Sequence, residues 1–379
     1  MTIDNRLSHA IRTTLILKAC NLIRTERDRR NIFEAMRTQH VDGTRDEAKW
    51  LSLANIPGGG RQEHAAVALN SNTIGIVGGI TPDASAVLAP FSSTDLVQLY
   101  CISENTWKTA TRLPQPLNHP NAIGFDNKLY VFGGFDDGGD TRKILHSVNA
   151  SWVYDSISDT WNSLPPLSPP RAQAALATHE DKVYVVGGFT ALVVSEQLPL
   201  PATLTHVSVF DTTTSSWITE DFLPEPARHI PSGVDHARAE VVNDKLYVIG
   251  GFDHGGFNSI NHVFILDLLD LAAGWKEGAS MPTPRATFGA GVIGTKIMTI
   301  GGEGNATSAA EIPLRVFNEI EVYDTITDSW ESWGTLPATE KGRQGPGVSV
   351  GGKIYIAGGY DTAPVGPLDR LDVYVPGKV

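Results

Sequence analysis

A short pattern that ends in two glycines occurs six times in the chain, and it limits the possible folds more than any other feature. Each copy is a run of mostly β-branched, aromatic or aliphatic residues followed by the glycine pair. The first glycines lie 51 to 63 residues apart, a spacing typical of proteins built from one structural unit per copy. The pairs are Gly78-Gly79, Gly133-Gly134, Gly187-Gly188, Gly250-Gly251, Gly301-Gly302 and Gly358-Gly359.

A tryptophan follows the first glycine of five copies by 25 to 30 residues. In most copies it comes shortly after an aromatic or aliphatic residue and an aspartate, as in Tyr154-Asp155. The sixth copy reaches Val379 without a tryptophan, whereas Trp50 stands before the first glycine pair. We therefore expect the segment around Trp50 to supply the last strand of the sixth unit. The five tryptophans are Trp107, Trp161, Trp217, Trp275 and Trp330.

We expect each repeat to form a four-stranded antiparallel sheet. Such a sheet cannot bury both faces alone, so neighbouring sheets must pack around a ring. An open ring would expose apolar faces and sheet edges, and a blade shared by both chain ends removes them. The sequence predicts an all-β fold: a six-bladed propeller over residues 46–379, closed by an N-terminal strand.

The glycine doublets, the aromatic-Asp step and the spaced tryptophans resemble the kelch-repeat family of β-propellers. The resemblance covers roughly residues 46–379 and implies four strands per blade around a central channel. It also implies that ligands and partners are met at one rim of the channel. That rim is formed by the loop after each glycine pair and by the loop before each innermost strand.

Residues 1–45 differ from the repeats. Apolar residues at helical spacing, among them Leu7, Ile11 and Leu15, predict a helical or mobile N-terminal extension. Lys18 interrupts the apolar run, so we expect neither a secretory signal nor a membrane span. The formal net charge of −12 argues against nucleic-acid binding. These features predict a cytoplasmic protein.

The rim loops contain residues suited to binding a small substrate. Aromatic rings and a few polar groups around an enclosed space are typical of such sites. The phenylalanines can equally pack their own loops, and arginines that follow a proline can be structural. The candidate substrate-binding residues are Phe135, Phe189, Phe252, Tyr360, Glu303, His119, Arg61, Arg171, Arg238, Arg285 and Arg343.

Histidines outside the repeated pattern are candidate catalytic residues. His64 follows Glu63, and His236 follows Asp235, in both cases just before an innermost strand. His254 lies in a glycine-rich loop. An imidazole beside a carboxylate can act as a general acid or base near neutral pH, although such histidines also serve as loop hydrogen-bonders.

The sequence supports no metal or cofactor site, because it lacks a His-Glu-x-x-His motif, a cysteine pair and an EF-hand loop. Two functional hypotheses remain. The first is a cofactor-independent isomerase, cyclase or lyase that acts on a small organic molecule at the channel mouth. The second is a protein-interaction scaffold that binds an acidic partner through the rim arginines.

Overall fold

A computed structural model describes residues 48–82, 91–137, 144–193, 203–218, 222–253, 258–304, 315–337, 345–361 and 366–377. Residue contacts group residues 48–376 into one compact unit. The predicted N-terminal extension, residues 1–45, lies outside the described residues. In the described part of the chain, no helix combines the length and apolar character needed to cross a bilayer.

The described residues form six antiparallel sheets, each built around four strands. The first comprises β2 (Ala65–Asn70), β3 (Thr73–Val77), β6 (Val97–Cys101) and β7 (Thr106–Thr109). The second comprises β8 (Ala122–Phe125), β9 (Lys128–Asp136), β10 (Ile144–Asp155) and β11 (Thr160–Leu164), with β14 (Ala191–Val193) paired to β10. The third comprises β12 (Ala175–His179), β13 (Lys182–Val186), β15 (Val207–Asp211) and β16 (Ser216–Trp217).

The remaining sheets repeat this order. The fourth comprises β17 (Arg238–Val242), β18 (Lys245–Ile249), β19 (Val263–Asp267) and β20 (Trp275–Glu277). The fifth comprises β21 (Gly289–Ile293), β22 (Lys296–Ile300), β25 (Glu319–Asp324) and β26 (Ser329–Thr335). The sixth comprises β27 (Gly347–Val350), β28 (Lys353–Ala357), β29 (Leu371–Val375) and β1 (Lys49–Ser52).

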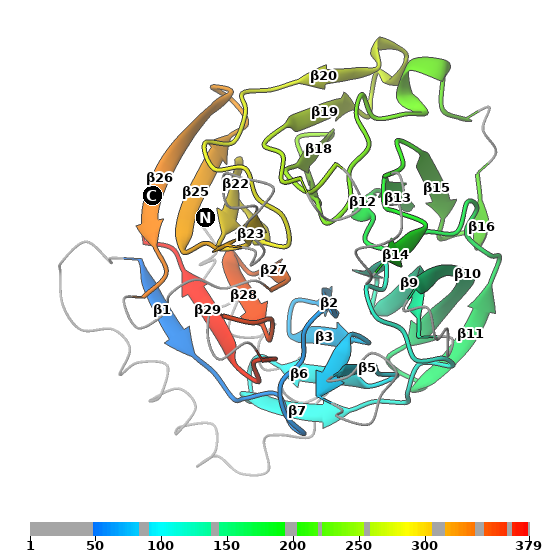
Figure 1. Cartoon of the computed structure of the whole chain (residues 1–379), viewed down its shortest axis with the longest axis vertical. Helices are drawn as coiled ribbons and strands as arrows, with labels where there is room; N and C mark the ends of the chain where they lie inside the picture. The colour runs from blue at the N-terminus through cyan, green and yellow to red at the C-terminus, as the bar shows by residue number, and fades with distance from the viewer. Residues whose placement is uncertain are drawn as a thin grey trace, which may run out of the picture. The chain divides into compact units, whose positions relative to one another are not determined.

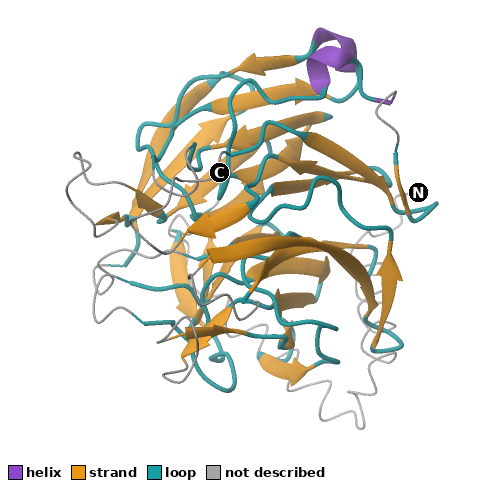
Figure 2. Ribbon diagram, turned by 45° about the vertical axis from the view of Figure 1, so that its right-hand side comes forward, coloured by secondary structure: helices purple, strands orange, loops and turns teal. Residues whose placement is uncertain are grey.

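The six sheets are the blades of a ring, and the predicted six-bladed propeller is confirmed (Figure 1). The first strand of each blade lies innermost, as β2, β12 and β27 show in Figure 1. Two short ribbons, β4 (Ile80–Pro82) with β5 (Phe91–Ser93) and β23 (Glu303–Gly304) with β24 (Arg315–Val316), extend from the blades. Figure 2 shows strands and loops throughout, apart from the short helical turns η2 (Glu225–Ala227) and η3 (Leu271–Ala273).

The sixth blade joins the two ends of the ring, as the sequence predicts. Strand β1 pairs antiparallel with β29, and Trp50 lies opposite Tyr374. The two rings are in edge contact, with centroids 5.3 Å apart. The Ser52 hydroxyl also donates a 2.8 Å hydrogen bond to Asp372. The ring is therefore closed by both backbone pairing and side-chain packing.

The repeated tryptophans connect neighbouring blades. In five blades the indole Nε1–H donates to a backbone carbonyl in the connection that leaves the preceding blade. This bond satisfies the one polar atom of a large apolar side chain at each blade boundary. The acceptors are Ala54 for Trp107 (2.7 Å), Thr111 for Trp161 (2.9 Å), Pro165 for Trp217 (3.0 Å), Ala227 for Trp275 (3.2 Å) and Ala279 for Trp330 (2.7 Å).

The glycine pairs allow a close approach between backbones. Both glycines have positive φ in all six copies. At Gly251, φ is 102°, and an added Cβ would lie only 2.5 Å from the carbonyl oxygen of Asp235. The Gly251 amide donates to the carbonyl of Arg285 in the next blade at 3.0 Å. The doublet therefore holds each blade against the loop that carries the candidate site residues.

Replacing Gly251 with alanine should destabilise the ring more than the same change at Gly59. Gly59 has a similar φ of 106° but no atom within 4 Å of an added Cβ. The backbone penalty is therefore matched, and only Gly251→Ala adds a steric clash, worth about 1–3 kcal/mol. We expect the thermal midpoint of Gly251→Ala to lie roughly 3–8 °C below that of Gly59→Ala. Equal midpoints in calorimetry would contradict this account of the doublet.

Candidate functional site

One position in each blade, two or three residues before the innermost strand, forms a ring around the channel. In five blades the residue has a left-handed backbone with φ between 48° and 54°. Glycine occupies the position in the sixth blade. We call these residues the mouth ring: Glu63, His119, Gln173, His236, Thr287 and Gly345.

Backbone hydrogen bonds connect the mouth ring from blade to blade. Five of the six amides, those of blades two to six, donate to the carbonyl of the equivalent residue in the preceding blade. Because the bonds fix the backbone, the side chains of distant repeats are brought together at fixed positions. The bonds run from His119 to Glu63 (2.9 Å), Gln173 to His119 (3.4 Å), His236 to Gln173 (3.0 Å), Thr287 to His236 (3.1 Å) and Gly345 to Thr287 (3.1 Å).

His119 is buried, and each of its ring nitrogens has a close polar neighbour. Its Nδ1 lies 2.6 Å from Oδ1 of Asn118, and its Nε2 lies 3.1 Å from Oε2 of Glu63. The Asn118 amide nitrogen donates to Ser93 and to the Asp137 carboxylate, which places Oδ1 against the imidazole. The proton of neutral His119 is therefore on Nδ1. Burial, with a smaller effect of His236, holds the pKa of His119 well below its usual value.

His236 is oriented by the carboxylate that precedes it. Its Nδ1 lies 2.5 Å from Oδ1 of Asp235, whose side chain is fully buried. Burial alone would lower the pKa of His236, but the hydrogen bond and charge of Asp235 raise it, with help from Glu63 and Glu303. The His119 and His236 rings are edge to face, with centroids 5.3 Å apart.

Glu63 faces both histidines. Its side chain is 14% exposed, and Oε2 also lies 3.5 Å from the amide nitrogen of Gln173. Burial raises the pKa of Glu63 to about 7, although the charge of His236 opposes the shift. Among the described residues, one ligand atom from each of Glu63, His119 and His236 lies within 4.8 Å of the other two. The mouth ring thus brings together three titratable groups from blades one, two and four.

The three predicted phenylalanines pack around these histidines. Phe135, Phe189 and Phe252 are almost completely buried. Phe135 lies 5.5 Å from the His119 ring, and Phe189 and Phe252 each lie 5.5 Å from the His236 ring, measured between centroids. The structure therefore brings the predicted aromatics to the site, where they surround the imidazoles with apolar groups.

Glu303 and Tyr360 form a second polar group beside the mouth ring. The Tyr360 hydroxyl donates to Oε2 of Glu303, and the Thr287 hydroxyl donates to Oε1 at 2.5 Å. Glu303 is buried, and burial with its negative charge raises the pKa of Tyr360. This group links blades five and six to the cluster formed by blades one, two and four.

A cavity of about 330 Å³ extends from the mouth ring along the central channel. The innermost strands contribute many small side chains to its wall, so the channel stays open instead of being filled. Larger apolar side chains complete the wall. The lining includes Glu63, Gln173 and Thr287 of the mouth ring, with Ala66, Ala68, Ala122, Ile123, Ala174, Leu176, Ala239 and Val348.

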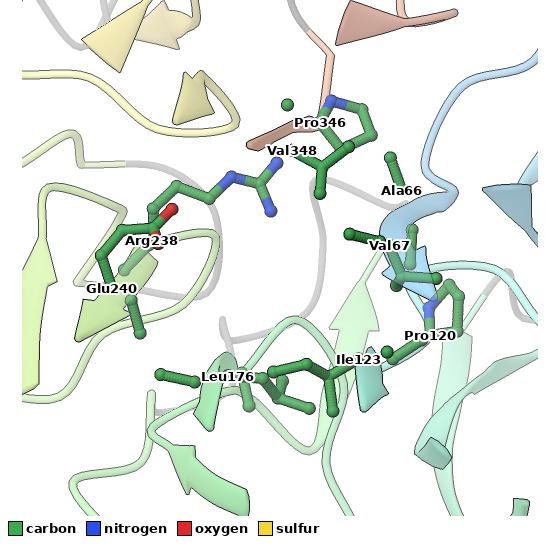
Figure 3. Close-up of a pocket in the computed structure, with 18 of the residues that line it drawn as sticks. Ala66, Val67, Pro120, Ile123, Leu176, Arg238, Glu240, Pro346 and Val348 are labelled. Carbon is green, nitrogen blue, oxygen red and sulfur yellow. The ribbon is translucent and has the colours of Figure 1, made fainter. Parts of the chain in front are cut away.

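Strand β17 places two charged side chains on this wall. Figure 3 shows the Arg238 guanidinium extending across the cavity toward Val348 and Pro346, with Glu240 nearby. Arg238 Nε donates to the carbonyl of Phe288 at 2.8 Å. Burial lowers the pKa of Arg238 to about 10 and raises that of Glu240 to about 7. Two ionisable groups are therefore available on the wall of the channel.

Three of the predicted substrate-binding arginines are internal. Arg61, Arg171 and Arg285 are at most 1% exposed. Arg171 donates to the carbonyls of Pro169 and Val185 at 3.0 and 3.2 Å. Arg285 donates to the carbonyls of Gly301 and Glu319, both at 2.9 Å. These guanidinium groups are used to satisfy backbone carbonyls, and none of the three lines the cavity.

The remaining predicted residues divide between the cavity and regions that are not described. His64 is buried, lines the cavity and packs between blades one and six, since a Cβ on Gly358 would lie 2.8 Å from its Cε1. His254 and Arg343 lie outside the described residues. The structure thus brings together Glu63, His119 and His236, with Asp235 and the phenylalanines around them.

Four residues of the site were not predicted: Asn118, Gln173, Glu240 and Thr287. Two of them, Gln173 and Thr287, carry a signal that was available, because every mouth-ring residue lies 13 to 15 positions before the first glycine of its repeat. Aligning the repeats on that glycine would have found Gln173 and Thr287. For Glu240 the available signal was its position two residues after the predicted Arg238, because residues two apart on a strand share a face.

Comparisons with known proteins agree with this architecture, a six-bladed propeller with its candidate site at one end of the channel. The KLHDC2/KLHL20/DRC7 Kelch-repeats domain matches residues 40–220 and 198–375. The chain belongs to the kelch-repeat family.

Individual relatives show how far the similarity extends. Kelch-like protein terF of Aspergillus terreus is 32% identical over 321 residues, covering 82% of this chain and 64% of that protein. Kelch-like protein 41b of Danio rerio is 28% identical, covering 73% of this chain and 42% of that protein. The chain thus spans less than two thirds of these relatives. The solved structure of YjhT has a TM-score of 0.65 at 18% identity, covers 84% of this chain and 96% of that one, and shares the fold.

Replacing Glu240 with glutamine should change how stability depends on pH. The pKa of Glu240 is raised from its ordinary 4.5 to about 7, so the folded protein holds this proton more tightly than the unfolded chain. Ionised Glu240 therefore removes stability as the pH rises from about 4.5 through 7. We expect the midpoint of Glu240→Gln, relative to the native chain, to increase by a few degrees between pH 5 and pH 8.

The control is Glu277→Gln on β20, whose side chain is exposed. Its midpoint difference from the native chain should stay constant over the same pH range. Parallel curves for Glu240→Gln and the native chain, measured by differential scanning calorimetry, would show that the fold does not raise the pKa of Glu240.

Proposed function

We propose that the chain is an enzyme that acts on a small organic molecule held at the mouth of the channel, catalysing an isomerisation, a cyclisation or an elimination. The observation that supports this most strongly is that Glu63, which lines the cavity, converges with His119 and His236. Pockets that combine apolar walls with a few oriented polar groups are typical of small-molecule sites.

The cavity restricts the molecule that it accepts. A volume of about 330 Å³ suits a compound of modest size and is narrow for a folded protein segment. Ile123, Leu176 and Val348 provide apolar contacts, whereas the mouth ring and Arg238 provide polar ones (Figure 3). The best match is an organic molecule with an apolar body and a polar group that is directed toward the mouth ring.

The proposed reaction needs groups that can withdraw a proton from the molecule and return it. Glu63, His119 and His236 are the candidates, because Glu63 lines the cavity and one ligand atom from each histidine lies within 4.8 Å of it in the described part of the chain. Asn118 and Asp235 act as positioning residues, since each fixes one imidazole through Nδ1. The surrounding phenylalanines limit water near the imidazoles, which strengthens electrostatic interactions with a bound molecule.

The alternative is a protein-interaction scaffold. Two of the similar proteins are named as kelch-like proteins, and the family membership is consistent with partner binding. The version based on rim arginines loses support, because Arg61, Arg171 and Arg285 are internal and Arg238 faces the cavity. The enzyme hypothesis uses the described side chains more fully.

The function can be tested without knowing the substrate. The full chain is incubated with a metabolite extract, and untargeted mass spectrometry follows changes in small molecules. We expect a compound to be converted into a product of equal mass, or of a mass lowered by one small neutral molecule. His236→Gln should lower the rate at least about 100-fold, because general acid–base groups contribute roughly 10²–10⁴.

A pair of substitutions at Leu176 tests the location. Leu176→Trp should fill the cavity and abolish conversion, whereas Leu176→Met keeps the side-chain volume and should retain it. Circular dichroism verifies that each variant folds. The proposal fails if the native chain converts no compound, or if Leu176→Trp converts as fast as Leu176→Met. Recovery of a stoichiometric protein partner without any conversion would favour the scaffold.

A further inference from the structure

The mouth ring brings two imidazoles and one carboxyl group close together in the described part of the chain. His119 carries its proton on Nδ1, because Oδ1 of Asn118 accepts from that atom. Asp235 accepts from Nδ1 of His236 in the same way. The lone pairs of both neutral rings are therefore on Nε2. With Glu63, three ligand atoms lie within 4.8 Å of one another in the described part of the chain.

The contact between Glu63 and His119 needs a shared proton or a cation. Oε2 of Glu63 lies 3.1 Å from Nε2 of His119, and both atoms are acceptors once the His119 proton is on Nδ1. Two facing lone pairs repel unless a proton or a cation lies between them. His236 lies beside this contact, with its ring centroid 5.3 Å from that of His119. The geometry is therefore suited to a cation with more than one protein ligand.

The neighbours of the histidines also resemble those of metal ligands. A histidine that binds a metal usually donates its other N–H to a carboxylate, a carbonyl or a similar acceptor, which fixes the ring. Asp235 and Asn118 provide these acceptors, at 2.5 and 2.6 Å. In turn Asn118 is fixed by Ser93 and Asp137. Burying these polar side chains costs free energy, and binding an ion through the histidines that they orient would offset that cost.

We propose that Glu63, His119 and His236 bind one divalent first-row transition-metal ion, of the class of zinc or iron(II). Two imidazoles and one carboxylate favour this class over calcium or magnesium, which prefer oxygen ligands. Ligand atoms around such an ion have bonds of about 2.0–2.2 Å, so small rotations of the three side chains bring them to coordination distance. The cavity beyond the ring leaves room for a further, non-protein ligand.

This inference rests on the proposed function, from which it takes the location of the site at the channel mouth. It adds a metal ion to that site. The ion takes the place of the proton that Glu63 and His119 otherwise share. A bound ion of this class would supply a Lewis acid that polarises an oxygen of the small molecule. Glu63, His119 and His236 would then hold the ion, while Arg238 and the apolar wall orient the molecule.

Cobalt(II) is the probe, because it substitutes for zinc and its visible absorption reports ligand geometry. The full chain is dialysed against chelator, then against metal-free buffer, and titrated with cobalt(II). We expect one equivalent to bind with absorption bands characteristic of coordinated cobalt. His119→Gln, His236→Gln and Glu63→Gln should each weaken binding at least about 10-fold, and Asp235→Asn roughly 10- to 100-fold. Glutamine suits these positions because Gln173 occupies the same ring position with φ of 48°.

The matched control is His206→Gln. His206 and His229 form another pair of imidazoles, with ring centroids 5.6 Å apart, away from the mouth ring. His206→Gln should leave cobalt binding unchanged. The metal proposal is overturned if the native chain binds no cobalt beyond what His119→Gln binds, or if His206→Gln removes the signal. Thermal midpoints verify that the ring variants remain folded.

The two proposals fail in different ways. If the chain converts a metabolite after dialysis against chelator and binds no cobalt, the enzyme proposal stands and the metal site is overturned. If the chain binds one equivalent of cobalt through Glu63, His119 and His236 but converts no metabolite, the metal proposal stands and the enzyme proposal is overturned.

Discussion

The pairing of β1 with β29 is the contact on which the arrangement of the other blades depends. It joins residues about 320 positions apart, as in the bond from Ser52 to Asp372. Closing a loop of that length costs about 5 kcal/mol of chain entropy on a simple polymer estimate. The cost is offset only when all six blades pack against their neighbours. Ring closure and blade packing therefore form cooperatively. The positions of the mouth-ring side chains depend on both.

Closure also explains why the site can be built from distant repeats. The mouth-ring bonds connect one backbone position per blade, so the backbone is nearly invariant while the side chain differs from blade to blade. Glu63, His119 and His236 occupy that position in three blades, whereas glycine occupies it in the sixth. The regular backbone provides the geometry, and the irregular side chains provide the chemistry. A change at one mouth-ring side chain can alter the site without altering the ring.

The sequence predicted the fold in detail because the fold depends on repeated features. The glycine pairs require positive φ, and Trp50 has its place in the last blade because its spacing continues the series. The site was predicted in part. Glu63, His119 and His236 were recognised one by one from their place before innermost strands. That these three side chains lie close together could not be predicted, because it depends on how the six blades are arranged around the narrow channel.

The arginines show a property that the local sequence does not predict, the direction of a side chain. Arg61, Arg171 and Arg285 stand in the same loops as the mouth ring, two positions earlier, and the sequence does not give the direction of a side chain. Their guanidinium groups turn into their own blades and donate to oxygen atoms of buried residues. Arg171 donates to the carbonyl of Val185 on strand β13, and Arg285 donates to the carbonyl of Gly301 in the glycine pair. The loops thus have an internal, structural residue followed by a residue that faces the channel.

The apolar surroundings of the mouth ring give its chemistry a physical basis. Phe135, Phe189 and Phe252 exclude water from the imidazoles, so an isolated charge there is costly. The same burial holds the pKa of His119 low and that of Glu63 high. The low pKa of His119 keeps its Nε2 lone pair available. A Glu63 carboxyl group with a pKa of about 7 is close to half ionised at neutral pH, so it exchanges its proton for another cation at little cost. The fold has therefore placed its polar groups where a ligand with positive charge, or a proton from a substrate, gains most from binding.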